Sequence, residues 1–150
     1  MSEISDAPSM PMSRKVLCGV YAMIAAVAFV ATWIQNMAYQ FVALDFFSSF
    51  WRETRVTPAS RSVTVDILMF GLAAAVLMVV EARKHGVPYV WVYLVGGLFI
   101  GISVTFPLFL IARQLRLNPA ETLRIPAKDT VLLILLAVTV LLAVIWISAG

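Results

Sequence analysis

Four long apolar runs constrain the fold of this chain more than any other feature of its sequence. They cover residues 16–34, 63–80, 89–111 and 131–147, and charged residues or turn formers flank each of them. The hydrocarbon core of a bilayer is about 30 Å thick, and a helix of ~20 mainly apolar residues crosses it. We therefore predict an all-α fold, a multi-pass transmembrane helical bundle with about four spans.

The composition supports a location in a membrane. Hydrophobic residues make up 62% of the 150 residues and charged residues only 13%, against about 45–50% and about 25% in ordinary soluble domains. A soluble chain of this length could not bury so much apolar surface. We expect the protein to lie in a cell membrane, the plasma or inner membrane, with membrane lipids around its helices.

The polar segments suggest how the chain is divided. Residues 1–13 contain Ser, Asp, Glu and two prolines and are predicted to form a disordered polar tail, while residues 14–150 form a single transmembrane helical domain. The first apolar run continues well past Ala28, which favours a spanning helix over a cleaved signal peptide. The connection between the first two runs is interpreted as an interfacial segment, which either continues the first helix or forms a short helix on the membrane surface. Its aromatic residues include Phe46, Phe47, Phe50 and Trp51.

The basic residues leave the orientation of the termini open. The connections after the first and third runs hold more Lys and Arg than the tail and the connection after the second run, which favours both termini outside. Two basic residues directly before the first run argue for the reverse. The connections after the first and third runs hold Arg52, Arg55, Arg61, Arg113, Arg116, Arg124 and Lys128. The segment before the first run and the connection after the second hold Arg14, Lys15, Arg83 and Lys84.

Small residues at four-residue spacing mark three of the runs, with Ala22 and Ala26 in the first. The third run contains Gly97 and Gly101, and the second contains Gly71 and Ala75. This spacing lets another membrane helix approach closely. We expect these residues to serve helix packing, either within the chain or at the seam of a homo-oligomer.

One candidate polar site follows from the short connection, residues 81–88, between the second and third runs. If these runs form an antiparallel helical hairpin, Asp66 and Arg113 lie at similar depth, and the end of the first run brings Gln35 and Asn36 to the same membrane face. A carboxylate inside a span costs a few kcal/mol, so an ion pair between Asp66 and Arg113 in a polar pocket is one interpretation. The other places Asp66 in the first turn of its helix, where it faces the positive end of the helix dipole.

Two further residues carry expectations of their own. Glu81 follows the second run beside several basic residues, and we expect it to be an exposed interfacial charge. Pro107 removes a backbone hydrogen bond near the end of the third run and is predicted to kink that helix. The kink would set the direction in which the Arg113 side chain points.

The remaining sequence argues against several classes of site. Cys18 is the single cysteine and His85 the single histidine, so no metal site and no cofactor are expected. The basic residues form no stripe interleaved with aromatic residues, which argues against binding to nucleic acid.

The order of these residues resembles a family of uncharacterised bacterial integral membrane proteins known as domain of unknown function 2834. The similarity covers about residues 14–116, and its most specific part is the ending "FPLFLIAR". It implies location and fold only, since no activity is established for the family, and it implies about three spans, so the fourth run is an addition. The other matching features are Trp33, Asn36, Asp66, the sequence "EARK", Trp91 and Tyr93.

Three classes of function remain at this stage. The first is a non-catalytic membrane protein that packs against a partner membrane protein or against a second copy of itself, which the small residues and the lack of a catalytic motif favour. The second is a lipid or small-molecule binding or transport protein that uses Asn36, Asp66 and Arg113. The third is an intramembrane enzyme that modifies an isoprenoid or another lipid, with Asp66 as the proton donor; the sequence leans against an enzyme because Asp66 is its only candidate acid.

Overall fold

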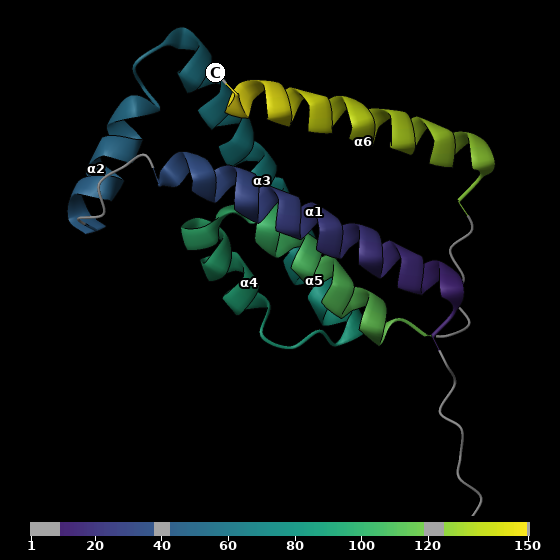
Figure 1. Ribbon diagram of the computed structural model, residues 1–150. Helices are drawn as coiled ribbons and strands as arrows, with labels where there is room; N and C mark the ends of the chain where they lie inside the picture. The colour runs from purple at the N-terminus through teal and green to yellow at the C-terminus, as the bar shows by residue number, and fades with distance from the viewer. Residues whose placement is uncertain (1–9, 38–42, 119–124, 150) are drawn as a thin grey trace, which may run out of the picture.

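The computed structural model describes residues 10–37, 43–118 and 125–149, and these segments form helices without strands (Figure 1). Of the predicted tail, residues 1–9 lie outside the described segments, and the first helix already begins at Met12. The all-α prediction is confirmed. The elements are α1 (Met12–Asn36), α2 (Ala43–Glu53), α3 (Pro58–His85), α4 (Val90–Gly96), the π-helical turn η1 (Gly97–Gly101), α5 (Ile102–Arg116) and α6 (Ala127–Ser148).

Four helical segments are long and apolar enough to cross a membrane, as the apolar runs predict. They are α1, α3, the segment Val90–Arg116 that combines α4, η1 and α5, and α6. The interfacial segment forms a helix of its own, α2, separate from α1. Three of the predicted runs lie inside helical segments of the structure, and the third begins one residue before its segment, at the N-cap residue Tyr89.

Local sequence signals explain where α3 begins and ends. At its start, the side chain of Thr57 accepts a hydrogen bond from the backbone N–H of Ser60 and the Ser60 hydroxyl accepts one from the N–H of Thr57, a capping box that precedes Pro58 at the first helical position. At its end, Gly86 adopts a left-handed conformation with φ 66°, which a residue without a side chain adopts freely. These caps fix α3 at 28 residues.

The third segment does not run straight through the bundle. It reverses at Gly97–Gly101, where Gly101 has φ 118° and ψ 135°, so that α4 and α5 lie side by side (Figure 1). The rings of Tyr93 and Phe109 lie 5.8 Å apart between centroids, whereas a straight helix would separate two residues at this spacing by about 24 Å. The segment is therefore a helical hairpin.

This reversal sets the direction of every helix in the bundle. α4 runs antiparallel to α3, as predicted for the second and third runs, but α5 turns back and runs parallel to α3. α5 lies between α1 and α3 and packs on both, and it is antiparallel to α1 (Figure 1). The prediction that the end of the third run meets the beginning of the second is wrong for this reason.

The centre of the bundle is small and lies where α3, α4 and α5 meet. Met78 and Phe109 are completely buried there, and Ala82, Val87 and Val90 complete the cluster. Among apolar lipid tails, close van der Waals packing rather than removal from water holds such helices together. Most other large apolar side chains of the described segments face outward.

The predicted small residues have different surroundings. A Cβ atom added to Gly97 would lie 3.0 Å from Oγ1 of Thr105, so the two arms of the hairpin meet at this residue. Gly71 has no atom within 4 Å of its added Cβ, and Ala75 is half-buried on α3. Pro107 is buried inside α5, which continues through it, and the chain changes direction at Gly97–Gly101 instead.

We expect Gly101→Ala to destabilise the protein, because alanine disfavours the positive φ that the reversal requires. The cost should be about 1–3 kcal/mol in the free energy of unfolding. Gly71→Ala is the matched control: it sits in open space inside a helix, where alanine should stabilise by about 0.5–1 kcal/mol. Unfolding in detergent, followed by circular dichroism, measures both, and equal stability of the two variants would contradict the hairpin.

Candidate functional site

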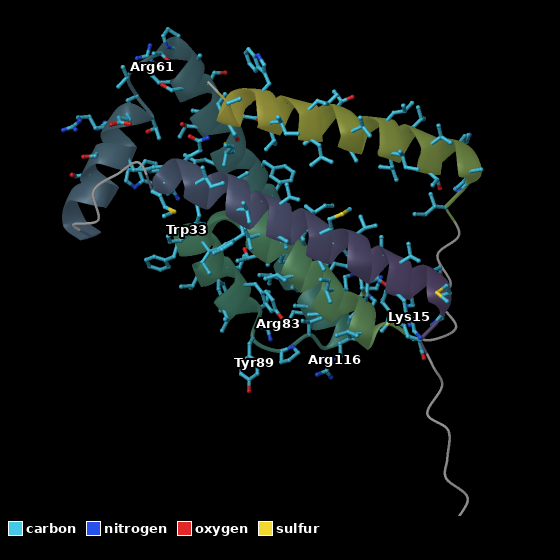
Figure 2. All side chains as sticks on the ribbon, viewed as in Figure 1. Lys15, Trp33, Arg61, Arg83, Tyr89 and Arg116 are labelled. Atoms are coloured by element: carbon cyan, nitrogen blue, oxygen red, sulfur yellow. The ribbon has the colours of Figure 1, made fainter. Side chains whose placement is uncertain are left out.

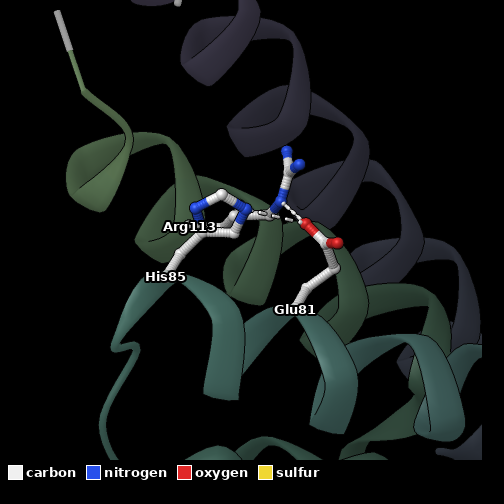
Figure 3. A network of polar contacts seen from close by, with 3 residues as sticks. All are labelled: Glu81, His85 and Arg113. Carbon is white, nitrogen blue, oxygen red and sulfur yellow. Dashed lines mark hydrogen bonds and ion pairs between the residues drawn. The ribbon is translucent and has the colours of Figure 1, made fainter.

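A cluster of three charged or ionisable side chains joins α3 to α5 (Figure 3). Nε of Arg113 donates a hydrogen bond to Oε2 of Glu81. Nε2 of His85, one turn after Glu81 on the same helix, lies 3.3 Å from the same oxygen. One carboxylate oxygen thus faces two nitrogen atoms from two different helices.

The cluster is mostly covered by protein. The exposed fractions of the side chains are 26% for Arg113, 16% for Glu81 and 11% for His85. The guanidinium group of Arg113 extends toward α1 (Figure 3). Because charges in such a setting are poorly solvated, removal of one partner strands the other.

The helix ends explain why this combination of residues is stable. Cations near the last turn of a helix interact favourably with the negative end of its dipole, and a carboxylate there does not. Glu81 lies near the C-terminal end of α3, so it needs a cation, and α5 supplies Arg113 from its own last turns. The spacing of Glu81 and His85 by four residues places their side chains on one face of α3.

The predicted ion pair between Asp66 and Arg113 does not form. Asp66 lies 15 residues before Glu81 on α3, about 22 Å along the helix axis, and its side chain is exposed. Gln35 is exposed and Asn36 half-buried at the C-terminal end of α1, the opposite end of the bundle from Arg113. The reversal at Gly97–Gly101 carries Arg113 away from all three of them.

Sequence reasoning also assigned Glu81 incorrectly, as an exposed charge. The signal that could have corrected it was the group of three glycines at residues 96, 97 and 101, which permits a reversal as well as close helix packing. With the chain reversed there, Glu81 becomes the acid closest to Arg113 along the helices.

The arrangement of Glu81, His85 and Arg113 is better suited to holding α3 and α5 together than to proton transfer. Oε2 of Glu81 already faces Arg113 and His85, which keeps it from acting as a free proton acceptor. Within the described segments, no group of three or more His, Cys, Asp or Glu side chains is arranged to hold a metal ion. The cluster therefore ties α3 and α5 together at one end of the bundle.

A double-mutant cycle measures this connection. Glu81→Gln and Arg113→Gln should each lower the free energy of unfolding in detergent by about 1–3 kcal/mol, and the double variant should lose clearly less than the sum. Asp66→Asn is the control, since Asp66 is exposed and distant, and it should change stability by less than about 0.5 kcal/mol. Additive losses from Glu81 and Arg113 would show that the contact contributes nothing to stability.

The comparisons with known proteins identify a family and no activity. The family described as Protein of unknown function DUF2834 matches residues 20–115, a range that includes the hairpin and the Glu81 cluster and leaves out α6. No curated protein and no solved structure matches the chain. Since the match covers well over half of the sequence and confirms the resemblance found there, the chain belongs to the DUF2834 family.

Proposed function

We propose that this protein is a multi-pass membrane protein of the plasma or inner membrane with a non-catalytic role, in which it packs against a second copy of itself through α6. The membrane assignment is supported by four apolar helical segments. The role is supported by the division of the described bundle into a packed core and a loosely attached helix. Asp66, on which an enzyme or a transport pathway would depend, is exposed in the described structure, and Arg113 pairs with Glu81 instead.

The charges support one orientation. Basic residues gather at the end of the bundle where α1 and α6 begin and α3 and α5 end. Figure 2 shows Lys15, Arg83 and Arg116 toward this end and Arg61 toward the other. Since Lys and Arg concentrate on the cytoplasmic side, this basic end faces the cytoplasm. Its basic residues in the described segments are Arg14, Lys15, Arg83, Lys84, Arg113, Arg116 and Lys128, against Arg52, Arg55 and Arg61 at the other end.

The hairpin changes the expected path through the bilayer. In this proposal α1, α3 and α6 cross the membrane, while α4 and α5 enter from the cytoplasmic side and return to it. Irregular backbone at membrane depth is tolerated where protein covers it, and η1 contacts α1, α4 and α5, although none of its residues is buried. The connections on either side of Val90–Arg116 then lie on the same side of the membrane.

Labelling of single cysteines tests this path. In a Cys18→Ala background, Lys84→Cys and Asn118→Cys should react with an impermeant maleimide only from the cytoplasmic side, and Ala59→Cys only from the opposite side. All three positions are exposed. If Asn118→Cys reacts together with Ala59→Cys, the segment Val90–Arg116 crosses the membrane and the re-entrant path is wrong.

The observation that carries the proposed role is the isolation of α6. None of its 22 residues is buried, and it contacts α1 only slightly. It also lies outside the range shared with the family. Apolar exposure is normal in lipid, but a spanning helix that contributes so little to its own bundle is free to pack against another helix, and closed symmetric dimers are the commonest homo-oligomers.

A cysteine scan from residue 137 to residue 143, in the Cys18→Ala background, tests the dimer. Oxidation in native membranes should give disulfide-linked dimers at positions that recur every three to four residues, because one face of α6 meets its copy. The same scan over residues 67–73 of α3 is the control. No dimers from α6, or dimers of equal yield at every position, would contradict a specific interface.

A further inference from the structure

Arg14 is buried at the basic end of the bundle with donors that have no partner. Its exposed fraction is 5%, and its Nε and one terminal nitrogen, Nη2, are fully covered and make no hydrogen bond. Arginine stays protonated in proteins, and a buried charge without a counter-ion costs several kcal/mol. A guanidinium in this state requires an anion.

The described part of the chain does not supply that anion. The described basic end holds two acids, Glu81 and Asp129 in the first turn of α6. Oε2 of Glu81 accepts a hydrogen bond from Arg113, and neither acid forms an ion pair with Arg14 in the described residues. The first turn of α1 contains no acidic residue, and the positive end of its helix dipole adds to the positive potential around Arg14. Lys15, beside it, is exposed and adds a second cation.

These features match the requirements for binding a phosphate group. A planar guanidinium can donate two parallel hydrogen bonds to phosphate oxygens, which at Arg14 requires the side chain to turn outward because Nε and Nη2 are covered. The N-terminal turn of a helix favours negative charge. In the proposed membrane orientation, Arg14 lies where α1 enters the bilayer from the cytoplasm, at the level of the lipid headgroups. Basic pockets between helices on this side of membranes bind anionic headgroups.

We propose that Arg14 is the receptor for a phosphate group at the cytoplasmic end of α1, and that the phosphate of an anionic membrane lipid occupies it. The inference rests on the proposed membrane embedding. Failure of that embedding would appear in the cysteine labelling, whereas failure of the site appears in purified protein in detergent, so the two outcomes are distinguishable.

The test measures thermal unfolding of the full chain in a neutral detergent after removal of lipid. The ligands are dioctanoyl phosphatidylglycerol, dioctanoylglycerol, which has the same acyl chains and no phosphate, and sodium phosphate. Wild type is compared with Arg14→Gln and with Lys15→Gln, which removes the same charge from the neighbouring exposed residue. Arg14→Lys keeps the positive charge and tests whether phosphate binding needs the planar guanidinium group.

Phosphatidylglycerol at 100 times its dissociation constant should raise the unfolding midpoint of wild type and Lys15→Gln by about 5–10 °C, and dioctanoylglycerol should not. Arg14→Gln should lose the shift, and Arg14→Lys should lose most of it. Without lipid, Arg14→Gln should unfold at the same temperature as wild type or higher, because it removes an uncompensated buried charge. A matching rise with sodium phosphate would identify the phosphate group, rather than the lipid, as the recognised unit.

Any of the following results would overturn the proposal. Equal shifts in all variants, or equal losses in Arg14→Gln and Lys15→Gln, would show only a diffuse attraction of the basic end for anionic lipid. A lower midpoint of lipid-free Arg14→Gln, with no response of wild type to phosphatidylglycerol or phosphate, would show that an acid of the chain itself neutralises Arg14. No response of wild type to either phosphate compound would also exclude the site.

Discussion

The left-handed backbone of Gly101 determines how the other helices of this protein pair. A φ of 118° ends one helix and begins another in the opposite direction, and only a residue without a side chain adopts this conformation at little cost. Gly97 adds the close approach that the two arms need. Because the chain turns here, α5 becomes the central helix, and it is the helix that packs on both α1 and α3.

The charged cluster depends on that turn. Glu81 near the C-terminal end of α3 is unfavourable by itself, since the helix dipole is negative there, and it becomes acceptable only when α5 runs parallel to α3 and presents Arg113 at the same level. The apolar cluster that contains Met78 and Phe109 lies about one turn further into the bundle. Apolar packing and a single ion pair thus join the same two helices, and a helix pair in lipid gains little from apolar surface alone.

Within the described bundle, α6 has few packing contacts and the charge of Arg14 has no counter-ion. α6 has the length and composition of a spanning helix but hardly packs, and Arg14 has a buried charge without a partner. Both lie on or beside α1, away from the contact between α3 and α5. The proposals of a second copy along α6 and of a phosphate group at Arg14 assign the missing contacts to the surroundings of the protein.

The sequence alone determined the helical class, the four apolar segments and the family, because the length and apolar character of a spanning helix are local properties. It also marked Arg113 as a charge that needs a partner, but it could not decide which one. The glycines at 97 and 101 have the same spacing whether they form a packing face or a reversal, and that choice depends on contacts such as Tyr93 with Phe109 across the hairpin. Only the tertiary structure could pair Arg113 with Glu81 instead of Asp66, because the partner of a charge near the end of one helix is set by the direction in which the neighbouring helix runs.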